Sequence, residues 1–276
     1  MRMRYLQCGS GPSLVLLHGL MGYSFSWRFV APVLAQQATV FAVDMPGAGF
    51  SDRPDNLDCS LRACAGRLLR FFDAAGIASC DLVGTSHGGG VAMMAASLAP
   101  HRIRRLILVA PVNPWSSWRK ELAVLLGNPL VAPIFLALAP RCEVLYAPFL
   151  RRLYGDTRRI KPGTLEGYVR PLRIPGAFRY GLGVLRSWKQ DLEVLGRILP
   201  QIADIPALLI WGSLDKAVDP GSAEYVRRQF KDCRLVMFDG VGHLPYEEAP
   251  DEFNRVVTQF LASSYYPVAG PRVVTP

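Results

Sequence analysis

Three side chains that together can perform nucleophilic catalysis occur in this 276-residue sequence in the order serine, aspartate, histidine. The serine, Ser86, lies between Gly84 and Gly88, where an apolar run leads into a stretch of good helix formers. Glycine tolerates backbone crowding that a Cβ would forbid, so this spacing predicts a tight strand-to-helix turn with Ser86 at its tip. A serine hydroxyl is a poor nucleophile unless a base lies beside it and a carboxylate orients that base.

The candidate acid and base follow two later strand-like runs. Asp215 comes just after the run 207–210, in "WGSLD", and His243 comes just after the run 235–238, in "GHLPYEEAP". A G-x-S-x-G turn is typically followed by an acid at the end of a late strand and then by a histidine in a later loop. The order therefore predicts that Ser86 is the nucleophile, His243 the base and Asp215 the residue that orients the base.

Other residues fit these roles less well. Asp204 precedes its strand, and Asp219 lies next to Pro220 at a predicted helix start. The three other histidines have different expected positions: His18 in an early glycine-containing loop, His87 directly after the nucleophile, and His101 in a basic run expected on the surface.

A nucleotide-binding interpretation of "GTSHGGG" is disfavoured. Ser86 occupies the position of the middle glycine in the dinucleotide-binding pattern, and no acid follows about 20 residues later. The loops around the candidate triad also lack the histidine clusters and the spacing of a metal site. We therefore expect neither an organic cofactor nor a metal.

Strand-like and helix-like runs alternate along the chain, which favours a mostly parallel sheet covered by helices on both faces. The expected strands are Leu14–Leu17, Val40–Val43, Asp81–Val83, Leu106–Val109, Ala207–Ile210 and Leu235–Phe238. The expected helices are Trp27–Gln36, Leu61–Ala75, Val91–Leu98, Ala223–Phe230 and Asp251–Leu261.

Four sequence blocks, in order, resemble those of the α/β-hydrolase superfamily, in particular its lidded serine hydrolases such as esterases and C–C bond hydrolases. The blocks are "LLHGLMG", "DMPGAGFSD", "GTSHGG" and the pair "WGSLD" with "GHLPYEEAP". The resemblance extends from His18 to about Phe260. It implies an α/β-hydrolase fold with a helical lid, and an oxyanion hole formed by the backbone N–H groups of Leu20 and His87.

Family members that dehalogenate alkanes or open epoxides carry aspartate at the tip of this turn, so Ser86 points instead to acyl chemistry. The expected reaction is hydrolysis of a carboxylic ester through an acyl-serine intermediate, with a small, apolar acyl compound as substrate. C–C bond hydrolysis, thioester hydrolysis and acyl transfer on the same triad stay open as alternatives. A non-catalytic ligand receptor also stays open as an alternative, because some relatives keep the triad but work as ligand receptors.

The alternation of strands and helices lapses in the middle of the chain. We expect a core in two parts, 1–111 and 205–262, separated by a helical lid over 112–204 and followed by a tail over 263–276. The uncharged run Leu122–Pro140 is long enough to suggest a membrane-spanning helix. Its prolines break the helical hydrogen-bond ladder, so two short apolar helices covering a cavity fit better.

Positive charge is concentrated in the expected lid. The segment 112–204 holds fourteen Lys and Arg against seven Asp and Glu, a net of +7, whereas the whole chain carries +9. No recognition motif accompanies this charge, so nucleic acid is not an expected partner. A weak peripheral contact with anionic membrane is an open alternative to a solvated basic lid.

The six cysteines are scattered without a C-x-x-C pair, and the N-terminal stretch does not resemble a cleaved signal peptide. Both observations favour reduced thiols and a cytoplasmic location. The oligomeric state is left open by the sequence.

Overall fold

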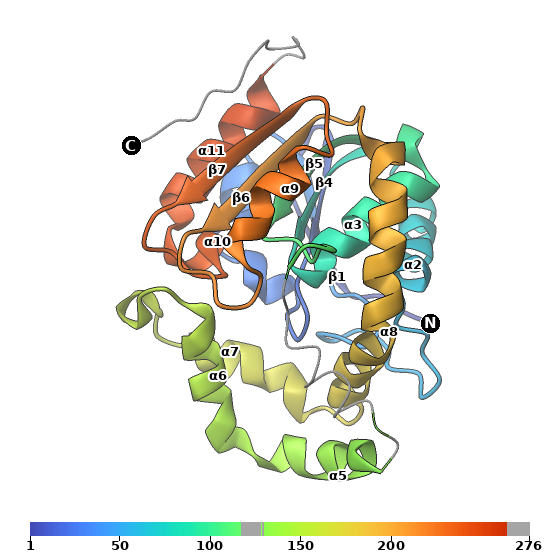
Figure 1. Cartoon of the computed structure of the whole chain (residues 1–276), viewed down its shortest axis with the longest axis vertical. Coiled ribbons are helices and arrows are strands. Elements are labelled where there is room, and N and C mark those ends of the chain that lie inside the picture. The colour runs from blue at the N-terminus through green and yellow to red at the C-terminus, as the bar shows by residue number, and fades with distance from the viewer. Residues whose placement is uncertain (117–127, 129, 264–276) are drawn as a thin grey trace.

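The computed structural model describes residues 1–116, 128 and 130–263. Its centre is a seven-stranded sheet in the order β1-β3-β2-β4-β5-β6-β7 (Figure 1). The strands are β1 Tyr5–Cys8, β2 Ser13–Leu17, β3 Thr39–Val43, β4 Cys80–Thr85, β5 Ile103–Val109, β6 Ala207–Gly212 and β7 Cys233–Phe238. All neighbours pair in parallel except β1, which runs antiparallel to β3. The mostly parallel sheet of the α/β-hydrolase fold is thereby confirmed.

All six predicted strands are present, and β1 is the strand that the sequence did not predict. It lies at the edge of the sheet, and Tyr5 and Leu6 on it are each more than two-fifths exposed. An edge strand with both faces partly in water needs no continuous apolar run, so its sequence carries little of the signal that marks the buried strands.

Helices cover both faces of the sheet. The α-helices of the core are α1 Ala31–Leu34, α2 Leu61–Ala74, α3 His87–Leu98, α9 Ala223–Arg227, α10 Pro245–Glu248 and α11 Pro250–Ala262. Short 3₁₀ helices join them: η1 Ser24–Trp27, η2 Pro100–Arg102 and η8 Pro220–Ser222. Alternate residues of a strand point to opposite faces, so Val15 and Leu17 pack with α2 and α3, whereas Leu14 and Leu16 pack with α1 and α11.

Three predicted helices differ from those observed. The run Trp27–Gln36 divides into η1 and the single turn of α1, where Pro32 occupies an early helical position. α9 ends at Arg227, earlier than predicted, and α3 begins at His87 instead of Val91. Three consecutive glycines form the first turn of α3, so close packing overrides their weak helix propensity there.

A helical insertion lies between β5 and β6. Its α-helices are α5 Val131–Leu138, α6 Tyr146–Leu153, α7 Thr164–Val169 and α8 Ala177–Ile198. Its 3₁₀ helices are η3 Ala139–Arg141, η4 Glu143–Leu145, η5 Thr157–Arg159, η6 Arg170–Arg173 and η7 Leu199–Ile202. In Figure 1, α5, α6 and α7 lie beyond one end of the sheet, while α8 runs back alongside α2 and α3. We call the part from 128 to 176 the cap.

The predicted lid is thus helical, as expected, while its limits at 112 and 204 stay a prediction. The predicted tail lies almost wholly outside the described residues, and so do residues 122–127 and 129 of the run Leu122–Pro140. In the part of the chain that is described, no single helix is both long and apolar enough to cross a membrane. One pair, Val131–Arg141 with Glu143–Leu153, has the length and composition to do so but is bent by 82°.

The turn after β4 is as crowded as its glycines predict. A Cβ on Gly84 would lie 2.7 Å from the carbonyl carbon of Gly88. A Cβ on Gly88 would in turn meet the carbonyl oxygens of His18 and Leu17, the latter at 2.7 Å. These neighbours are backbone atoms of α3, of the sheet and of its first loop, which cannot rotate away as a side chain could. The close approach therefore requires glycine at both positions.

We expect Gly88→Ala to lower the free energy of unfolding by about 2–3 kcal/mol, the upper part of the range for overpacking, because the new methyl must displace backbone. Gly66→Ala is the matched control. Gly66 lies within α2, and a Cβ there would come no nearer than 4.0 Å to the Arg70 side chain. That variant should gain about 0.5–1 kcal/mol from helix propensity. Urea unfolding measures both, and equal effects would contradict the packing argument.

Candidate active site

Ser86 occupies the tip of the turn between β4 and α3 in a strained conformation. Its φ is 53° and its ψ −120°, a region that residues with a Cβ seldom adopt. Surrounding hydrogen bonds hold it there: its N–H donates to the Val109 carbonyl at 2.9 Å, and its own carbonyl accepts from Val112 at 3.0 Å. The backbone thus directs the side chain away from the helix, and Ser86 lines a large cavity at this end of the sheet.

Asp215 and His243 form a buried hydrogen-bonded pair on the loops after β6 and β7. Asp215 Oδ2 lies 2.7 Å from His243 Nδ1. Asp215 Oδ1 accepts from the N–H groups of Ala217 at 2.7 Å and Val218 at 3.0 Å, which fixes the carboxylate. A carboxylate can only accept, so the proton of the pair lies on Nδ1 and Nε2 is left as an acceptor. His243 lines the same cavity as Ser86.

The competing residues lie elsewhere. The Asp204 side chain is 81% exposed and pairs with Lys231 at 2.6 Å. Asp219 Oδ1 accepts from the Gly221 N–H at 2.9 Å, which caps a 3₁₀ turn. His101 is exposed. Of the three acids considered from the sequence, Asp215 is the one that contacts His243.

The two predicted oxyanion donors flank Ser86. His87 is the first residue of α3, and the first N–H groups of a helix have no acceptor within it. Leu20 follows Gly19, where a Cβ would lie only 3.1 Å from the Ser86 Cβ. Within the described chain, neither the Leu20 nor the His87 N–H donates a hydrogen bond. Both amides are therefore available for a ligand.

The His18 ring fixes the loop that carries Leu20. Its Nε2 accepts from the Met45 N–H at 3.0 Å, and its Nδ1 donates to the Gly19 carbonyl at 2.8 Å. Burial lowers the pKa of His18, which keeps the ring neutral and able to make both bonds. The sequence predicted that His18 lies in this loop but did not predict that its ring fixes the loop.

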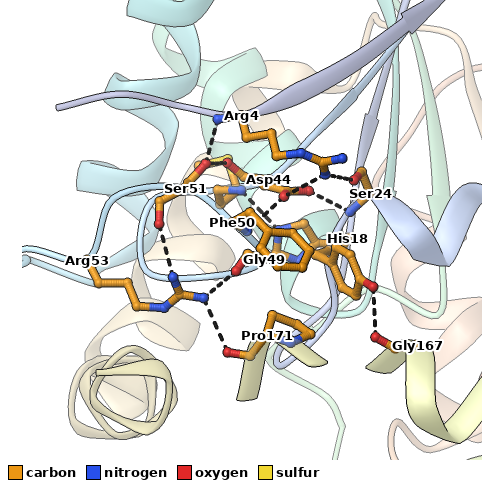
Figure 2. Close-up of polar contacts among 12 residues, drawn as sticks. Arg4, His18, Ser24, Asp44, Gly49, Phe50, Ser51, Arg53, Gly167 and Pro171 are labelled. Atoms are coloured by element: carbon orange, nitrogen blue, oxygen red, sulfur yellow. Dashed lines mark hydrogen bonds and ion pairs between the residues drawn. The ribbon is translucent and has the colours of Figure 1, made fainter. Parts of the chain in front are cut away.

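The loop 44–52 is organised by one buried carboxylate (Figure 2). Asp44 Oδ1 accepts from the Ser24 N–H at 2.7 Å, and Oδ2 accepts from the Phe50 N–H at 2.9 Å and from Arg4 at 3.3 Å. Figure 2 also shows Arg53 reaching from the end of this loop to the carbonyls of Gly49 and of Pro171 in the cap. The loop therefore supports the cap near its C-terminal end.

A cavity of about 570 Å³ lies between the cap and the ends of the strands. Ser86, His243 and Leu20 line it on the core side. The cap contributes mostly apolar side chains: Phe135, Leu138, Ala139, Leu145, Phe149, Leu150, Leu153, Leu165, Val169 and Leu172. None of the described residues that line it is Asp, Glu, Lys or Arg. Such a cavity suits an uncharged, largely apolar ligand.

A buried carboxylate in α10 joins the cap to the core. Glu247 accepts a bidentate pair of bonds from Arg28, each at 2.9 Å, and a bond from the Tyr154 hydroxyl at 2.6 Å. The Tyr168 hydroxyl also donates to Glu247, and Arg28 donates to Thr164 at 2.9 Å. Both tyrosines and Thr164 belong to the cap, so this network fixes the position of the cap against α10. Glu247 itself is only four residues from His243.

The neighbouring carboxylate holds the histidine loop itself. Glu248 accepts from the N–H groups of Gly155 in the cap at 3.0 Å and of Gly242 at 2.7 Å. The His243 N–H donates to the Leu153 carbonyl at the end of α6, at 2.7 Å. Glu247 and Glu248 were not predicted as functional from the sequence. The two adjacent acids in "HLPYEEAP" were the available signal, and only the fold shows that they are buried.

The described residues contain no group of three or more His, Cys, Asp or Glu that could hold a metal ion. Six cysteines are free thiols, of which Cys59, Cys64 and Cys80 are buried. Burial raises the pKa of the Cys59 and Cys80 thiols to about 12. Because the thiolate is the reactive form of cysteine, these two are poor candidates for chemistry.

A strained serine after β4, with a hydrogen-bonded Asp–His pair on the loops after β6 and β7, defines the geometry of an α/β-hydrolase. Residues 12–250 match the family model for the alpha/beta hydrolase fold, and the chain belongs to that family. It is 32% identical to an uncharacterized protein of Mycobacterium tuberculosis over 92% of this chain and 76% of that protein. It is 29% identical to the pimeloyl-[acyl-carrier protein] methyl ester esterase of Aeromonas hydrophila, over 92% and 96% respectively.

Among solved structures, the chain is similar to that of a membrane phospholipase A described as a bacterial virulence factor. The two are 28% identical, the match covers 94% of this chain and 82% of the other, and the TM-score is 0.74.

The His87 ring gives a test of the buried site. Burial, and then the nearby His18, lower the pKa of His87 to about 3. As the pH falls below about 6.5 the unfolded chain binds a proton that the folded chain does not, so stability is lost between pH 6.5 and 3. Between pH 7 and pH 5, we expect the free energy of unfolding to fall by about 2 kcal/mol less in His87→Met than in the wild type.

Urea unfolding at the two pH values measures this loss. Replacing the exposed His101 by Met is the control for removal of one imidazole from the surface. An unchanged loss in His87→Met would show that the buried ring binds a proton in the folded state.

Proposed function

We propose that the protein is a serine hydrolase that cleaves a carboxylic ester through an acyl-serine intermediate. The observation that carries this proposal is the 2.7 Å Asp215–His243 pair, which opens onto the same uncharged cavity as the strained Ser86. A nucleophile, a base and an orienting acid are the minimum that this reaction needs.

In the proposed acylation step, Ser86 Oγ attacks the ester carbonyl carbon while His243 Nε2 takes the hydroxyl proton. Asp215 holds the ring with its proton on Nδ1 and stabilises the imidazolium that forms. The free N–H groups of Leu20 and His87 bind the oxyanion, and the dipole of α3 favours negative charge at that point. The imidazolium then gives its proton to the leaving alcohol, and the carbon–oxygen ester bond breaks.

In the proposed second step, water replaces the alcohol. His243 takes a proton from the water, whose oxygen attacks the acyl carbon, and then returns that proton to Ser86 Oγ as the acid leaves. No other group has to supply or accept electrons, so the residues named are sufficient for the whole cycle.

The substrate class follows from the cavity. Its lining residues are mostly apolar and carry no Lys, Arg, Asp or Glu among those described, so an acyl chain can bind without burying a charge opposite it. The similarity to a methyl ester esterase and to a phospholipase A supports an ester or lipid substrate. We therefore propose an apolar acyl ester as the substrate.

The first test is the nucleophile. A fluorophosphonate probe should label wild-type protein at Ser86, and Ser86→Ala should abolish both labelling and the hydrolysis of p-nitrophenyl esters. Ser116→Ala, which removes another hydroxyl from the cavity lining, should keep both. A series of acyl chain lengths in the same assay should give a higher kcat/KM for medium chains than for acetate. Wild-type turnover by Ser86→Ala would refute the assignment.

The second test is whether the pair acts as a unit. His243→Ala and Asp215→Asn should each lower kcat by roughly 10³-fold or more, because the base or its orientation is lost. The double variant should be scarcely worse than the poorer single one. Asp219→Asn, an acid nearby in the chain whose carboxylate caps a turn, should keep activity. Strictly additive losses would mean that the two residues act separately.

A further inference from the structure

The cap exposes large apolar side chains around the entrance of the cavity. Six residues, which we call the apolar rim, are more than half exposed: Leu130, Ile134, Leu138, Val144, Leu145 and Phe149. Leu130 and Val144 are exposed to 81% and 80%. These residues extend from Leu130, just before α5, to α6. α5 lies at the edge of the molecule farthest from the sheet, and α6 runs from there back toward the core (Figure 1).

The apolar rim is continuous with the cavity. Leu138, Leu145 and Phe149 line the cavity and are also exposed to solvent, so they stand at its mouth. An exposed apolar patch of this kind marks a surface that contacts another apolar phase. Whatever covers the rim therefore also faces the opening that leads to Ser86.

Positive charge accompanies the rim. Arg141, Arg151 and Arg152 are exposed, and within the described chain none of them has an ion-pair partner. The single acid between residues 130 and 153, Glu143, is already paired with Arg173 at 2.8 Å. The segment that carries the apolar rim thus also carries three exposed arginines without an ion-pair partner among the described residues, and these are free to meet anions.

We propose that the apolar rim docks on an anionic lipid bilayer, so that the mouth of the cavity faces the membrane. Apolar side chains inserted at the interface, with arginines beside anionic headgroups, are the features of a helix that lies in the membrane surface. The 82° bend between the two cap segments fits this in-plane arrangement and not a straight span. A fluid lipid phase can cover the rim and still deliver an apolar ester into the cavity, whereas a rigid protein partner would close the entrance.

Docking itself does not depend on catalysis, but delivery of an ester from the membrane rests on the proposed function. The test therefore separates the two. Binding is measured by co-sedimentation of the Ser86→Ala protein with vesicles, so that no lipid is hydrolysed. One set of vesicles is phosphatidylcholine, and the other is an equimolar mixture of phosphatidylcholine and phosphatidylglycerol. Turnover of a short, water-soluble ester is measured separately in proteins that keep Ser86.

We expect the parent protein to bind the anionic vesicles more tightly and to be released as ionic strength rises through the physiological range. Ile134→Glu with Val144→Glu should lower the partition coefficient for both vesicles at least tenfold. Arg151→Gln with Arg152→Gln should lower binding to the anionic vesicles by roughly fivefold per arginine and leave neutral vesicles unaffected. Leu6→Glu, at the exposed β1 edge, is the matched control and should bind as the parent does.

Neither Ile134 nor Val144 lines the cavity, so their double variant should hydrolyse the soluble ester at the wild-type rate, which also shows that it is folded. No binding of the parent to either vesicle, equal binding to both, or an equal loss in Leu6→Glu would overturn the proposal. So would a concentration-dependent dimer that the rim variant abolishes, because a second copy of the chain would then cover the rim.

Discussion

The candidate site depends on one packing constraint, the close approach of three backbone segments at the end of the central strands. Gly84 and Gly88 let the turn after β4 close on itself and on the first loop. Gly19 brings that loop against Ser86 from the other side. With the segments this close, Ser86 is held at positive φ, and two amides next to it have no acceptor among the residues that the structure describes. Backbone atoms that cannot move apart thus preorganise both the candidate nucleophile and the proposed oxyanion site.

The cap is joined to this core by charge as well as by apolar packing. Glu247 is fully buried, yet Arg28 and the hydroxyls of Tyr154 and Tyr168 satisfy it. Removing one partner of such a network leaves an uncompensated charge, so the arrangement is costly to open. Because Glu247 lies in the helix that follows His243, the same contacts that hold the cap also hold the histidine loop. Cap position and the geometry of the site are therefore coupled.

The apolar character of the cavity continues to the outside of the molecule. A closed pocket for a polar substrate would gain nothing from large apolar side chains such as Leu145 and Phe149 at its mouth. Exposing these side chains to water is unfavourable, and covering them with another apolar phase removes that cost. This makes the proposed substrate class and the proposed membrane surface two consequences of the same feature.

The sequence alone predicted the order of the core strands and helices, the tight turn at Ser86 and the candidates Asp215 and His243, because each depends on local periodicity or on the order of motifs. It could not reveal the edge strand β1, which lacks a continuous apolar run. Nor could it show that the adjacent acids at 247 and 248 are buried, since Arg28 and Gly155, which bind them, lie 219 and 93 residues away. Only the tertiary structure decided which acid meets His243 and which cap side chains border the cavity, because those contacts join loops that the sequence does not bring together.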